Sequence, residues 1–344
     1  MAHMDIFKSD AFGAVSITEA LNNVPFQPSF LRGLNLFMPK PVRTVGVSIE
    51  EKNGTLSLIQ TSERGAPLAE ADIEKRKIRD LRTRRIAKHD RLTADAIQGI
   101  RAFGSETELM QVVDEINMRI NGPTGLMRDV ELTWENMMLG AIQGVVLDAD
   151  GSTIYDYFSE FGIAAATEID FDLNNAAPAS GAVRKKCTQV TRQMMKAANG
   201  GFLPGRTYVM GLCGDAFWDD LTAHGEVRQT YLNTQEARDL RGGLAYESFN
   251  YGGITWVNYR GTDDGSTIAI NTDKCKFFPV NGNGVFQMAY SPAETFDYVN
   301  TPGLPVYGMV IPDAKRNAFV DLEVYSYPLP ICTRPAMLQS ARRT

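Results

Sequence analysis

The stretch from Ser105 to Leu147 is the feature that most constrains what this chain can fold into. Apolar residues recur at helical intervals along its first part, and Ser105 and Glu108 have the spacing of a capping box. Gly122-Pro123 interrupts the pattern, which then resumes as a second amphipathic stripe. The sequence therefore predicts a kinked helix or two helices, of which the second is about 30 Å long at 1.5 Å per residue. Such a helix can form the axis of a domain, although an ordinary helix pair packed on a sheet produces the same periodicity.

Length and composition are those of a soluble globular chain. It has 344 residues, of which 44% are hydrophobic and 22% charged, which allows a large core and two or three domains. No apolar run approaches the ~20 residues that cross a bilayer, and charged residues interrupt the apolar core that a secretory signal would need. The net charge of −6 gives no reason to expect general nucleic-acid binding. We expect a cytoplasmic origin, with residues 1–3 a cloning remnant before Met4.

Residues 4–42 are apolar, but four prolines break them and force extended chain after a short helix over 16–22. So short a segment cannot cover its own large apolar side chains. We therefore expect an arm laid across another surface, in this subunit or in a neighbouring one. The arm residues predicted at a subunit interface are Phe26, Phe30, Leu31, Leu34 and Phe37.

A strand signal follows the arm. Apolar and polar residues alternate over 45–49 and again over 56–58, and Asn53-Gly54 between them suits a type I′ turn. We therefore predict a hairpin that returns at 56–58.

Residues 74–91 carry nine basic residues against three acidic ones, a local charge near +6 in a chain whose net charge is −6. Such polarity suits contact with identical subunits or with a phosphate-rich partner, and a solvated strand face is the plain alternative. The run lacks the interleaved aromatic residues of base stacking, which argues against nucleic-acid readout. The basic residues predicted at a subunit interface are Arg76, Arg79, Arg82, Arg84, Arg85 and Lys88.

The rest of the chain mixes helices and strands. We predict helices over 180–199, ended by Gly200-Gly201, and over 215–223. The predicted strands are 153–161, 207–212, 254–259, 267–270 and 319–327. The mixture indicates an α+β fold, and its arms and loops are too long for a compact monomer.

Enzyme signatures are poor. The four cysteines form no C-x-x-C pair, which argues against a metal site. Cys213 lies in a turn that superficially resembles that of a thiol nucleophile, but it ends an apolar strand, which favours a buried structural thiol. His224 follows a short predicted helix, which favours a capping role at its C-terminus. The sequence predicts no catalytic residue, no cofactor and no metal; a soluble cytoplasmic enzyme using Cys213 or His224 is a remote alternative.

Two long stretches resemble a known family. Residues 4–31 (MDIFKSDAFGAVSITEALNNVPFQPSFL) resemble the opening of lambda-type major capsid proteins of tailed bacteriophages, where a Phe, a Ser-Leu/Ile-Thr and an Asn-x-x-Pro-Phe/Tyr-x-Pro recur in this order. Residues 277–307 (FFPVNGNGVFQMAYSPAETFDYVNTPGLPVY) are similar to that family's Phe-Phe-Pro, Gly-x-Phe, Ala/Ser-Pro-Ala and Val-Asn-Thr-Pro-Gly-Leu-Pro series. The ending, with Ser326–Leu329 and Arg334-Pro335, is also similar, so the resemblance covers essentially the whole chain.

The resemblance implies the Hong Kong 97-like phage capsid fold. Its implied segments are an N-terminal arm (1–43), an extended β-hairpin loop that reaches over a neighbouring subunit (44–93), a peripheral domain with the spine helix (94–170), an axial domain (171–290) and a C-terminal return to the peripheral domain (291–344). The implied function is that of a structural major capsid protein, not an enzyme. It would self-assemble into the icosahedral head shell that encloses the dsDNA genome of a tailed bacteriophage or prophage.

The implied partners are copies of the chain in pentamers and hexamers, a decoration protein, a portal, a scaffolding protein and packaged dsDNA contacted non-specifically, with no membrane. We expect the protein in the virion shell, after assembly in the cytoplasm of the bacterial host. In this interpretation the arm supplies apolar burial, and the basic run meets acidic surface on a neighbour and sets the register of the contact. An encapsulin-like compartment, which holds cargo enzymes within the same fold, is the alternative.

Overall fold

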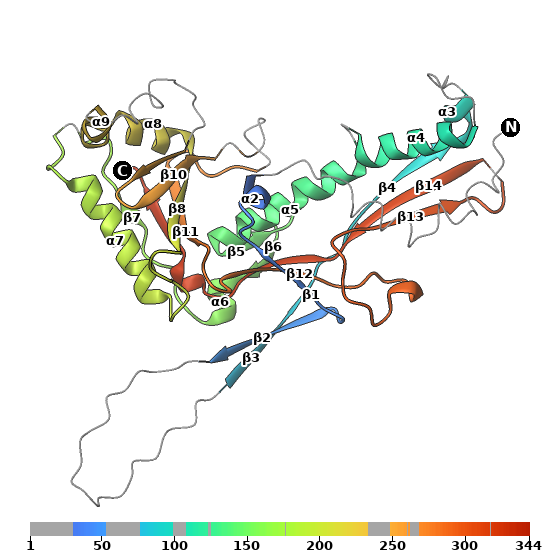
Figure 1. Ribbon diagram of the computed structural model, residues 1–344, viewed down its shortest axis with the longest axis horizontal. Coiled ribbons are helices and arrows are strands. Elements are labelled where there is room, and N and C mark those ends of the chain that lie inside the picture. Colours follow the sequence, from blue (N-terminus) through green and yellow to red (C-terminus); the bar gives the residue numbers. More distant parts are fainter. Residues whose placement is uncertain are drawn as a thin grey trace, which may run out of the picture.

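The computed structural model describes residues 30–52, 76–98, 108–122, 125–175, 177–232, 248–259, 261, 268–316 and 318–344. Figure 1 shows one lobe built on a large sheet, a second, elongated lobe built along two helices, and a β-hairpin that projects away from both. Within the described residues, no helix combines the length and apolar character that crossing a membrane requires.

The first lobe is built on a six-stranded sheet. In spatial order its strands are β7 (Ile169–Asp170), β16 (Gln339–Arg342), β11 (Lys274–Val280), β8 (Tyr208–Cys213), β10 (Ile254–Asn258) and β9 (Ser248–Tyr251). The helices α7 (Ala182–Ala197), α8 (Asp215–Ala223) and α9 (Gly225–Leu232) surround it (Figure 1). Its core is aromatic, because the rings of Phe171, Phe217, Trp256 and Phe277 meet with centroid separations from 5.3 to 6.1 Å. β8 runs through this core and is buried almost along its whole length, as its apolar sequence predicted.

The second lobe combines two helices with a three-stranded sheet. The helices are α4 (Glu108–Asn121) and α5 (Leu126–Gln143), and the strands, in spatial order, are β13 (Tyr307–Pro312), β14 (Phe319–Ser326) and β4 (Ile86–Thr93), which the short helix α3 (Ala94–Gln98) follows. Every second residue of β14 is buried, and the strand packs against both long helices. Trp134 of α5 is fully buried, and its indole N–H donates to the Ser326 hydroxyl at 3.2 Å. α5 is thus the axis around which this lobe packs.

The predicted interruption of the helical stretch is confirmed, because α4 ends at Asn121 and α5 begins at Leu126. The predicted continuation to Leu147 is wrong. Gly144 adopts a positive φ of 89°, and its N–H bonds to the carbonyls of the last helical turn, which is how glycine ends a helix. The chain then forms β5 (Val145–Leu147), which pairs with β6 (Thr153–Asp156). The predicted capping residue Ser105 lies outside the described residues.

A second three-stranded sheet lies between the lobes (Figure 1). It consists of β1 (Met38–Pro41), β12 (Phe286–Tyr290) and β15 (Pro328–Cys332), with β12 in the centre. β1 pairs with β12 in parallel, and β15 pairs with it antiparallel. Because β1 is an edge strand, its two prolines remove no hydrogen bond that the sheet requires. The short helix α2 (Phe30–Gly33) precedes β1 and packs on α5.

The projecting hairpin consists of β2 (Gly46–Lys52) and β3 (Arg76–Arg82). Their antiparallel register runs from Gly46 opposite Arg82 to Lys52 opposite Arg76. The sequence pattern did not predict this pairing of β2 with the basic run. The cross-strand pair Val47 and Leu81 supplies the reason for the pairing, since each is 1% exposed on the same face. Residues 53–75, which include the predicted turn, lie outside the described residues.

Elsewhere the predicted elements differ most where aromatic residues gather. The helix over 182–197, the helix over 215–223 and the strands at 208–213, 254–258 and 319–326 confirm the predictions to within a few residues. The predicted strand 153–161 is confirmed over β6 (Thr153–Asp156) and wrong beyond it, because the Asp156 carboxylate accepts hydrogen bonds from the N–H groups of Phe158 and Ser159 and so starts α6 (Tyr157–Phe161). The predicted strand 267–270 is also wrong over its described part, 268–270.

Strand pairing crosses the boundaries of two of the expected segments. The extended loop 44–93 ends in β4, which is paired over its whole length with β14 and so belongs to the second lobe. The C-terminal segment 291–344 supplies β13 and β14 to that lobe, but its last strand, β16, pairs with β11 and β7 in the six-stranded sheet. β16 carries buried residues on its inward face, so burial of that face holds the end of the chain in the first lobe.

Candidate assembly surfaces

The arm residues from Phe30 onward are seated on their own subunit. Leu31 is fully buried between α2 and α5, and its N–H donates to the Glu135 carboxylate at 3.1 Å. The Tyr259 hydroxyl donates to the same carboxylate oxygen at 3.0 Å. Because Glu135 lies on α5 and Tyr259 follows β10, this buried carboxylate joins the arm, the long helix and the six-stranded sheet.

The other predicted arm residues are covered to different degrees. Leu34 and Phe37 are partly buried against the core, and the Phe37 ring lies 5.2 Å from that of Phe286. Phe30 is 40% exposed and lies edge-on to Tyr259 at 5.8 Å. Phe26 lies outside the described residues. The arm was predicted to lie on its own subunit or on a neighbouring one. Its described part lies on its own subunit.

The base of the projecting hairpin is fixed to the body by Arg79. This side chain points inward from β3 and is 8% exposed. Its guanidinium donates to the carbonyls of Glu160 at 2.8 Å and Phe161 at 3.2 Å, and it lies 4.5 Å from the centre of the Phe161 ring. Both carbonyls lie at the C-terminus of α6, where a helix carries partial negative charge, so the positive guanidinium is stabilised there. Arg79 was predicted at a subunit interface, and the structure places it inside its own subunit.

Polar contacts around the hairpin base add to this anchor. The Tyr155 hydroxyl donates to the Arg82 carbonyl at 3.1 Å and accepts from the Arg82 N–H at 2.8 Å. The Thr83 hydroxyl donates to that of Ser291 at 2.8 Å, and Ser291 donates to the Thr44 carbonyl at 2.9 Å. Ser291 is 1% exposed. The direction in which the hairpin leaves the body is therefore set by buried hydrogen bonds.

Several charges of the basic run have partners within the subunit. Arg85 lies 3.6 Å from the Glu294 carboxylate, and Lys88 forms an ion pair with Asp129. The side chains of both pairs are about half exposed, and exposed pairs contribute little, about 0–1 kcal/mol each. They can therefore be exchanged for partners on another subunit at small cost.

Two further residues of the basic run, Arg82 and Arg84, point away from the core. Arg84 is exposed and its guanidinium lies 5.8 Å from the centre of the Tyr155 ring. Arg82 is also exposed. The structure describes the backbone of Arg76 within β3 but not its side chain. Arg82 and Arg84 thus remain available at the hairpin base.

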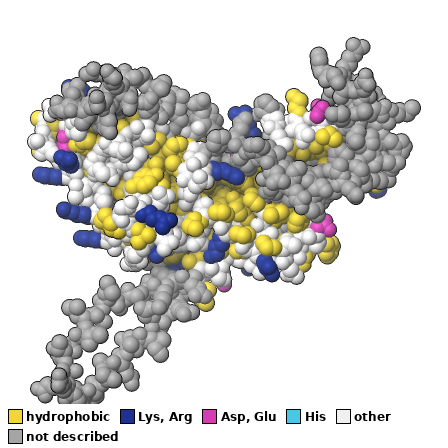
Figure 2. Space-filling view, in the orientation of Figure 1, with side chains coloured by type: hydrophobic (Ala, Val, Ile, Leu, Met, Phe, Trp, Pro, Cys, Tyr) yellow, Lys and Arg dark blue, Asp and Glu magenta, His cyan; other side chains and the backbone are white. Residues whose placement is uncertain are grey.

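The sequence analysis missed a second basic surface, on α7. This helix carries five basic residues and no acidic one: Arg184, Lys185, Lys186, Arg192 and Lys196. Figure 2 shows basic side chains projecting along the edge of the molecule over this helix. The Glu226 carboxylate, on α9, accepts hydrogen bonds from the N–H groups of Val183 and Arg184 and so caps the N-terminus of α7. A count of charges along the predicted helix 180–199 would have found this surface.

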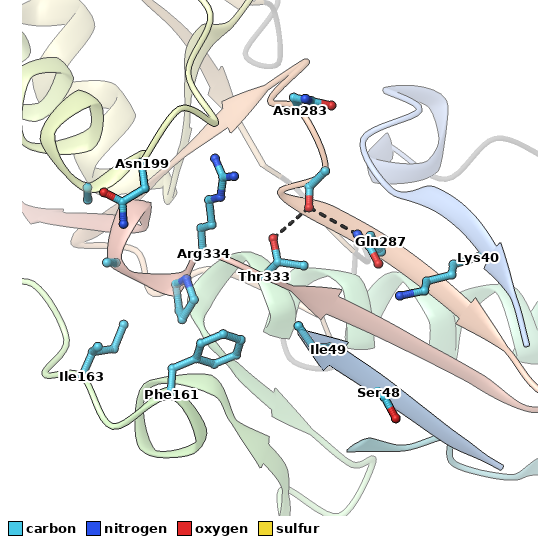
Figure 3. A pocket seen from close by; sticks show the side chains of 14 residues that line it. Lys40, Ser48, Ile49, Phe161, Ile163, Asn199, Asn283, Gln287, Thr333 and Arg334 are labelled. Atoms are coloured by element: carbon cyan, nitrogen blue, oxygen red, sulfur yellow. Dashed lines mark hydrogen bonds between the residues drawn. The ribbon is translucent and has the colours of Figure 1, made fainter. Parts of the chain in front are cut away.

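A polar cleft of about 660 Å³ opens between the hairpin base, the end of α7, the strand β12 and the segment that follows β15. Figure 3 shows amide, hydroxyl and basic side chains around it, among them Lys40, Asn199, Gln287 and Thr333. Arg334 lies on its wall and donates to the Ala198 carbonyl at 2.6 Å, closing the C-terminus of α7. None of the described lining residues is an acid, a histidine or a cysteine, so this lining offers no pair for general acid–base chemistry.

The two residues considered for catalysis are buried in structural positions. Cys213 is fully buried, as predicted, with its sulfur 3.4 Å from that of Cys275. His224 follows the last residue of α8, as predicted, but its side chain serves the next helix, because Nδ1 accepts from the Glu226 N–H at 3.3 Å. Neither residue lines the polar cleft.

Comparison of the sequence with known proteins finds one matching family. The sequence model of the family described as phage major capsid protein E matches residues 13–343. Two similar proteins are both named major capsid protein. That of Salmonella phage Felix O1 is 25% identical over 362 aligned residues, which cover 96% of each chain. That of Pseudomonas phage KPP10 is 23% identical over 322 residues, which cover 88% of this chain and 89% of its own.

Solved structures are similar along most of the chain. The mature capsid of bacteriophage PhiM1 matches with a TM-score of 0.52 at 12% identity, over 93% of this chain and 88% of that chain. The capsid of cyanophage A-1(L) matches with a TM-score of 0.52 at 13% identity, over 93% and 96%. The fold is thus a mixed α+β fold of the Hong Kong 97-like phage capsid type, as the resemblance implied.

Proposed function

This chain belongs to the phage major capsid protein E family and is a structural subunit of a phage shell; from that premise we propose that it self-assembles, as pentamers and hexamers, into the icosahedral head shell around the dsDNA genome of a tailed bacteriophage or prophage. The observation that carries the proposal is the family match over residues 13–343, which takes in every described element of the fold.

The projecting hairpin supports a role in contacts between subunits. β2 and β3 leave the body as a pair, with their direction set by the buried Arg79 and Ser291 contacts. One face of this pair packs on its own subunit and the other is exposed, as at Ile78, so that a rigid projection can reach a neighbour at a defined angle. Each such contact can be weak, because repetition in a closed lattice makes the shell stable.

The exposed basic residues at the hairpin base, Arg82 and Arg84, fit the proposal that they meet acidic surface on a neighbour. Charge complementarity of this kind selects the correct register of docking more than it adds affinity. The intrasubunit pairs of Arg85 and Lys88 are weak enough to exchange during assembly. The arm residues Phe30, Leu34 and Phe37 would contribute where they are not covered by their own subunit.

The basic face of α7 is our proposed place of non-specific contact with packaged dsDNA. Its cations face outward without interleaved acids, as phosphate contacts require. A decoration protein, a portal and a scaffolding protein are the other proposed partners, with assembly in the cytoplasm of the bacterial host. Family membership favours this role over the encapsulin-like alternative, and the burial of Cys213 and His224 supports a non-enzymatic role.

The test is electron microscopy of the purified protein together with its sedimentation profile, at low and high salt. We expect closed shells, and we expect high salt to weaken them because it screens exposed charge pairs. Monomers or small rings at every salt concentration, with the scaffolding protein of the same phage present, would contradict the proposal.

A further inference from the structure

Phe296 is a large apolar side chain that its own subunit leaves almost uncovered. It begins η3 (Phe296–Tyr298) in the loop 291–306 between β12 and β13, which we call the Phe296 loop, and it is 96% exposed. Val299 in the same loop is 58% exposed. In Figure 1 this loop is the orange excursion at the lower right.

The Phe296 loop is held firmly by its other residues. Tyr298 is 7% exposed, and its ring lies edge-on to that of Tyr307 with the centroids 4.7 Å apart. The Tyr307 hydroxyl accepts from the Leu304 N–H at 2.7 Å and donates to the Ser291 carbonyl at 3.2 Å. Phe296 is therefore presented to the outside at a fixed position. A side chain presented in this way is suited to act as an anchor in a pocket of a partner.

The same chain carries an apolar cavity of suitable size. The cavity has a volume of about 210 Å³ and opens between α2, α5 and β12. Its walls are largely apolar and include Phe37, Pro39, Trp134 and Met138. A dry apolar cavity of about 150 Å³ holds a benzene ring, so this cavity has room for the ring of a phenylalanine. Figure 2 shows hydrophobic side chains gathered on this face over β1 and β12.

The charges around the two features are complementary. Asp297, next to Phe296, is exposed, whereas Glu294, also exposed, lies 3.6 Å from Arg85 of its own subunit. Arg32 lies on the wall of the cavity, with its guanidinium 5.2 Å from the centre of the Trp134 ring. Glu131 also lies near Arg32 and offsets part of its charge. A carboxylate brought beside Arg32 from outside would be attracted to a guanidinium that burial has partly stripped of water.

We propose that Phe296 of one subunit inserts into the cavity between α2, α5 and β12 of a second copy of this chain, with Asp297 beside Arg32 of that copy. The inference rests on the proposed function, which requires copies of the chain to contact one another. Pro305 at the end of the Phe296 loop lines the cavity of its own subunit, but Phe296 and Asp297 do not, so an insertion into a second copy joins two different patches and is heterologous. Contacts of this type repeat from copy to copy and close into rings or continue as a lattice.

A cysteine pair tests the contact directly. Val299→Cys with Pro39→Cys places one thiol on the Phe296 loop, with Phe296 itself unchanged, and one at the rim of the cavity, whereas the four native cysteines are all buried. With copper-phenanthroline and oxygen as oxidant, two thiols lose their protons and two electrons and form one disulfide. We expect assembled shells of this variant to give a ladder of cross-linked species on a non-reducing gel. Each single variant, and Ile311→Cys with Pro39→Cys, should give none, because Ile311 is exposed on β13 away from the loop.

A second variant measures the contribution of the side chain. We expect Phe296→Ala to raise the concentration needed for shell formation about tenfold or more, while Phe296→Leu retains most of the assembly. The thermal unfolding midpoint should stay nearly unchanged, because Phe296 is 96% exposed and its truncation removes little buried surface. Val299→Ala is the matched control and should have a smaller effect.

Shells of the cysteine pair without a ladder, or normal assembly of Phe296→Ala, would overturn the inference. Equal cross-linking of the Ile311 control would do the same, because it would show that the thiols meet by random encounter. If the unmodified chain forms no shells under any condition, the proposed function fails and this inference fails with it. The two failures are distinct, since the first is read on the variants and the second on the parent chain.

Discussion

At the scale of single residues, burial decides which charges this subunit uses internally. Arg79 lies in the middle of a basic run. Successive side chains of a strand point to opposite faces, and on β3 the Arg79 side chain points inward, where it donates to the carbonyls at the end of α6. A buried guanidinium is tolerated there because those carbonyls accept its hydrogen bonds. Its neighbours Arg82 and Arg84 remain outside. The basic run therefore serves two purposes: Arg79 anchors the hairpin, and Arg82 and Arg84 form an exposed basic surface.

Glu131 of α5 gives a prediction for the pH dependence of stability. Burial raises the pKa of its carboxyl to about 6, against the opposing influence of Arg32 and Arg128. The folded chain thus holds this proton more tightly than the unfolded chain. Glu131 therefore favours folding at acidic pH, and this contribution is lost as the pH rises from about 4.5 through about 6. We expect Glu131→Gln, which mimics the protonated form, to unfold at a higher temperature than the parent at neutral pH.

The measurement is the thermal unfolding midpoint as a function of pH. The parent and Glu131→Gln should converge at acidic pH and separate above about pH 6. Asp95→Asn, which removes an exposed carboxylate in α3, is the control and should leave the pH profile nearly unchanged. Identical profiles for Glu131→Gln and the parent would contradict a raised pKa of this carboxyl in the folded chain.

At the scale of elements, the ends of the helices determine the architecture more than their apolar stripes do. The stripe of α5 would allow the helix to continue, but Gly144 ends it and returns the chain as β5 against its own helix. Asp156 similarly converts an aromatic run from strand to helix by capping α6. These local contacts place Tyr155 and the carbonyls of Glu160 and Phe161 where the hairpin base needs them.

Gly144→Ala tests the helix end. A methyl group there would lie 2.2 Å from a carbon of the Phe158 ring, and the backbone has a φ of 89° that alanine adopts only with strain. We expect this variant to lose at least about 2 kcal/mol of unfolding free energy. Gly151→Ala is the matched control, because its φ is 82° but nothing lies within 4 Å of the added methyl group. It should lose only the strain, about 1 kcal/mol.

Denaturant unfolding of the two glycine variants measures the difference. Equal losses would mean that the close approach to Phe158 is relieved by a small movement of the ring, so that backbone strain alone matters. A loss larger in Gly151→Ala would contradict the proposed role of Gly144 as the end of α5.

At the scale of the whole molecule, two lobes share one sheet and one long helix, and a hairpin projects from their junction (Figure 1). The polar cleft lies at the same junction, where the hairpin base meets the end of α7. Its walls come from segments far apart in the sequence, including β1, β2, β12 and the segment after β15. A change in the angle between the lobes would therefore also change the direction of the hairpin.

Arg82→Glu together with Arg85→Glu tests the charge of the hairpin base. We expect this variant to fold normally but to form no shells, because reversal of both charges turns attraction to acidic surface into repulsion. Arg85 lies 3.6 Å from Glu294, which belongs to the Phe296 loop of the same subunit. The double variant could therefore also disturb that loop. Arg82→Glu alone leaves this pair intact and so tests the contact with the neighbouring subunit by itself. The measurement is electron microscopy beside circular dichroism.

Lys315→Glu with Arg316→Glu is the control for this double variant. It makes the same change of charge in the exposed turn between β13 and β14, so a loss of shells in both variants would indicate a general effect of net charge. Normal shells from the Arg82 and Arg85 variant would refute the role of these charges in register.

The spacing of apolar residues and the positions of glycine and proline were enough to predict the elements that depend on local interactions. The interruption at Gly122, the helices α7 and α8 and the buried strand β8 follow from apolar spacing and from glycine, whose effects do not require distant partners. The family resemblance, carried by residues 4–31 and 277–307, predicted the fold. The tertiary structure alone decided what depends on distant contacts. It paired β2 with β3, returned β16 to the six-stranded sheet, turned Arg79 inward and left Phe296 outside. Each of these outcomes depends on which surfaces meet and exclude water. The sequence lists the residues that can form such surfaces, but only the folded chain determines which of them come together.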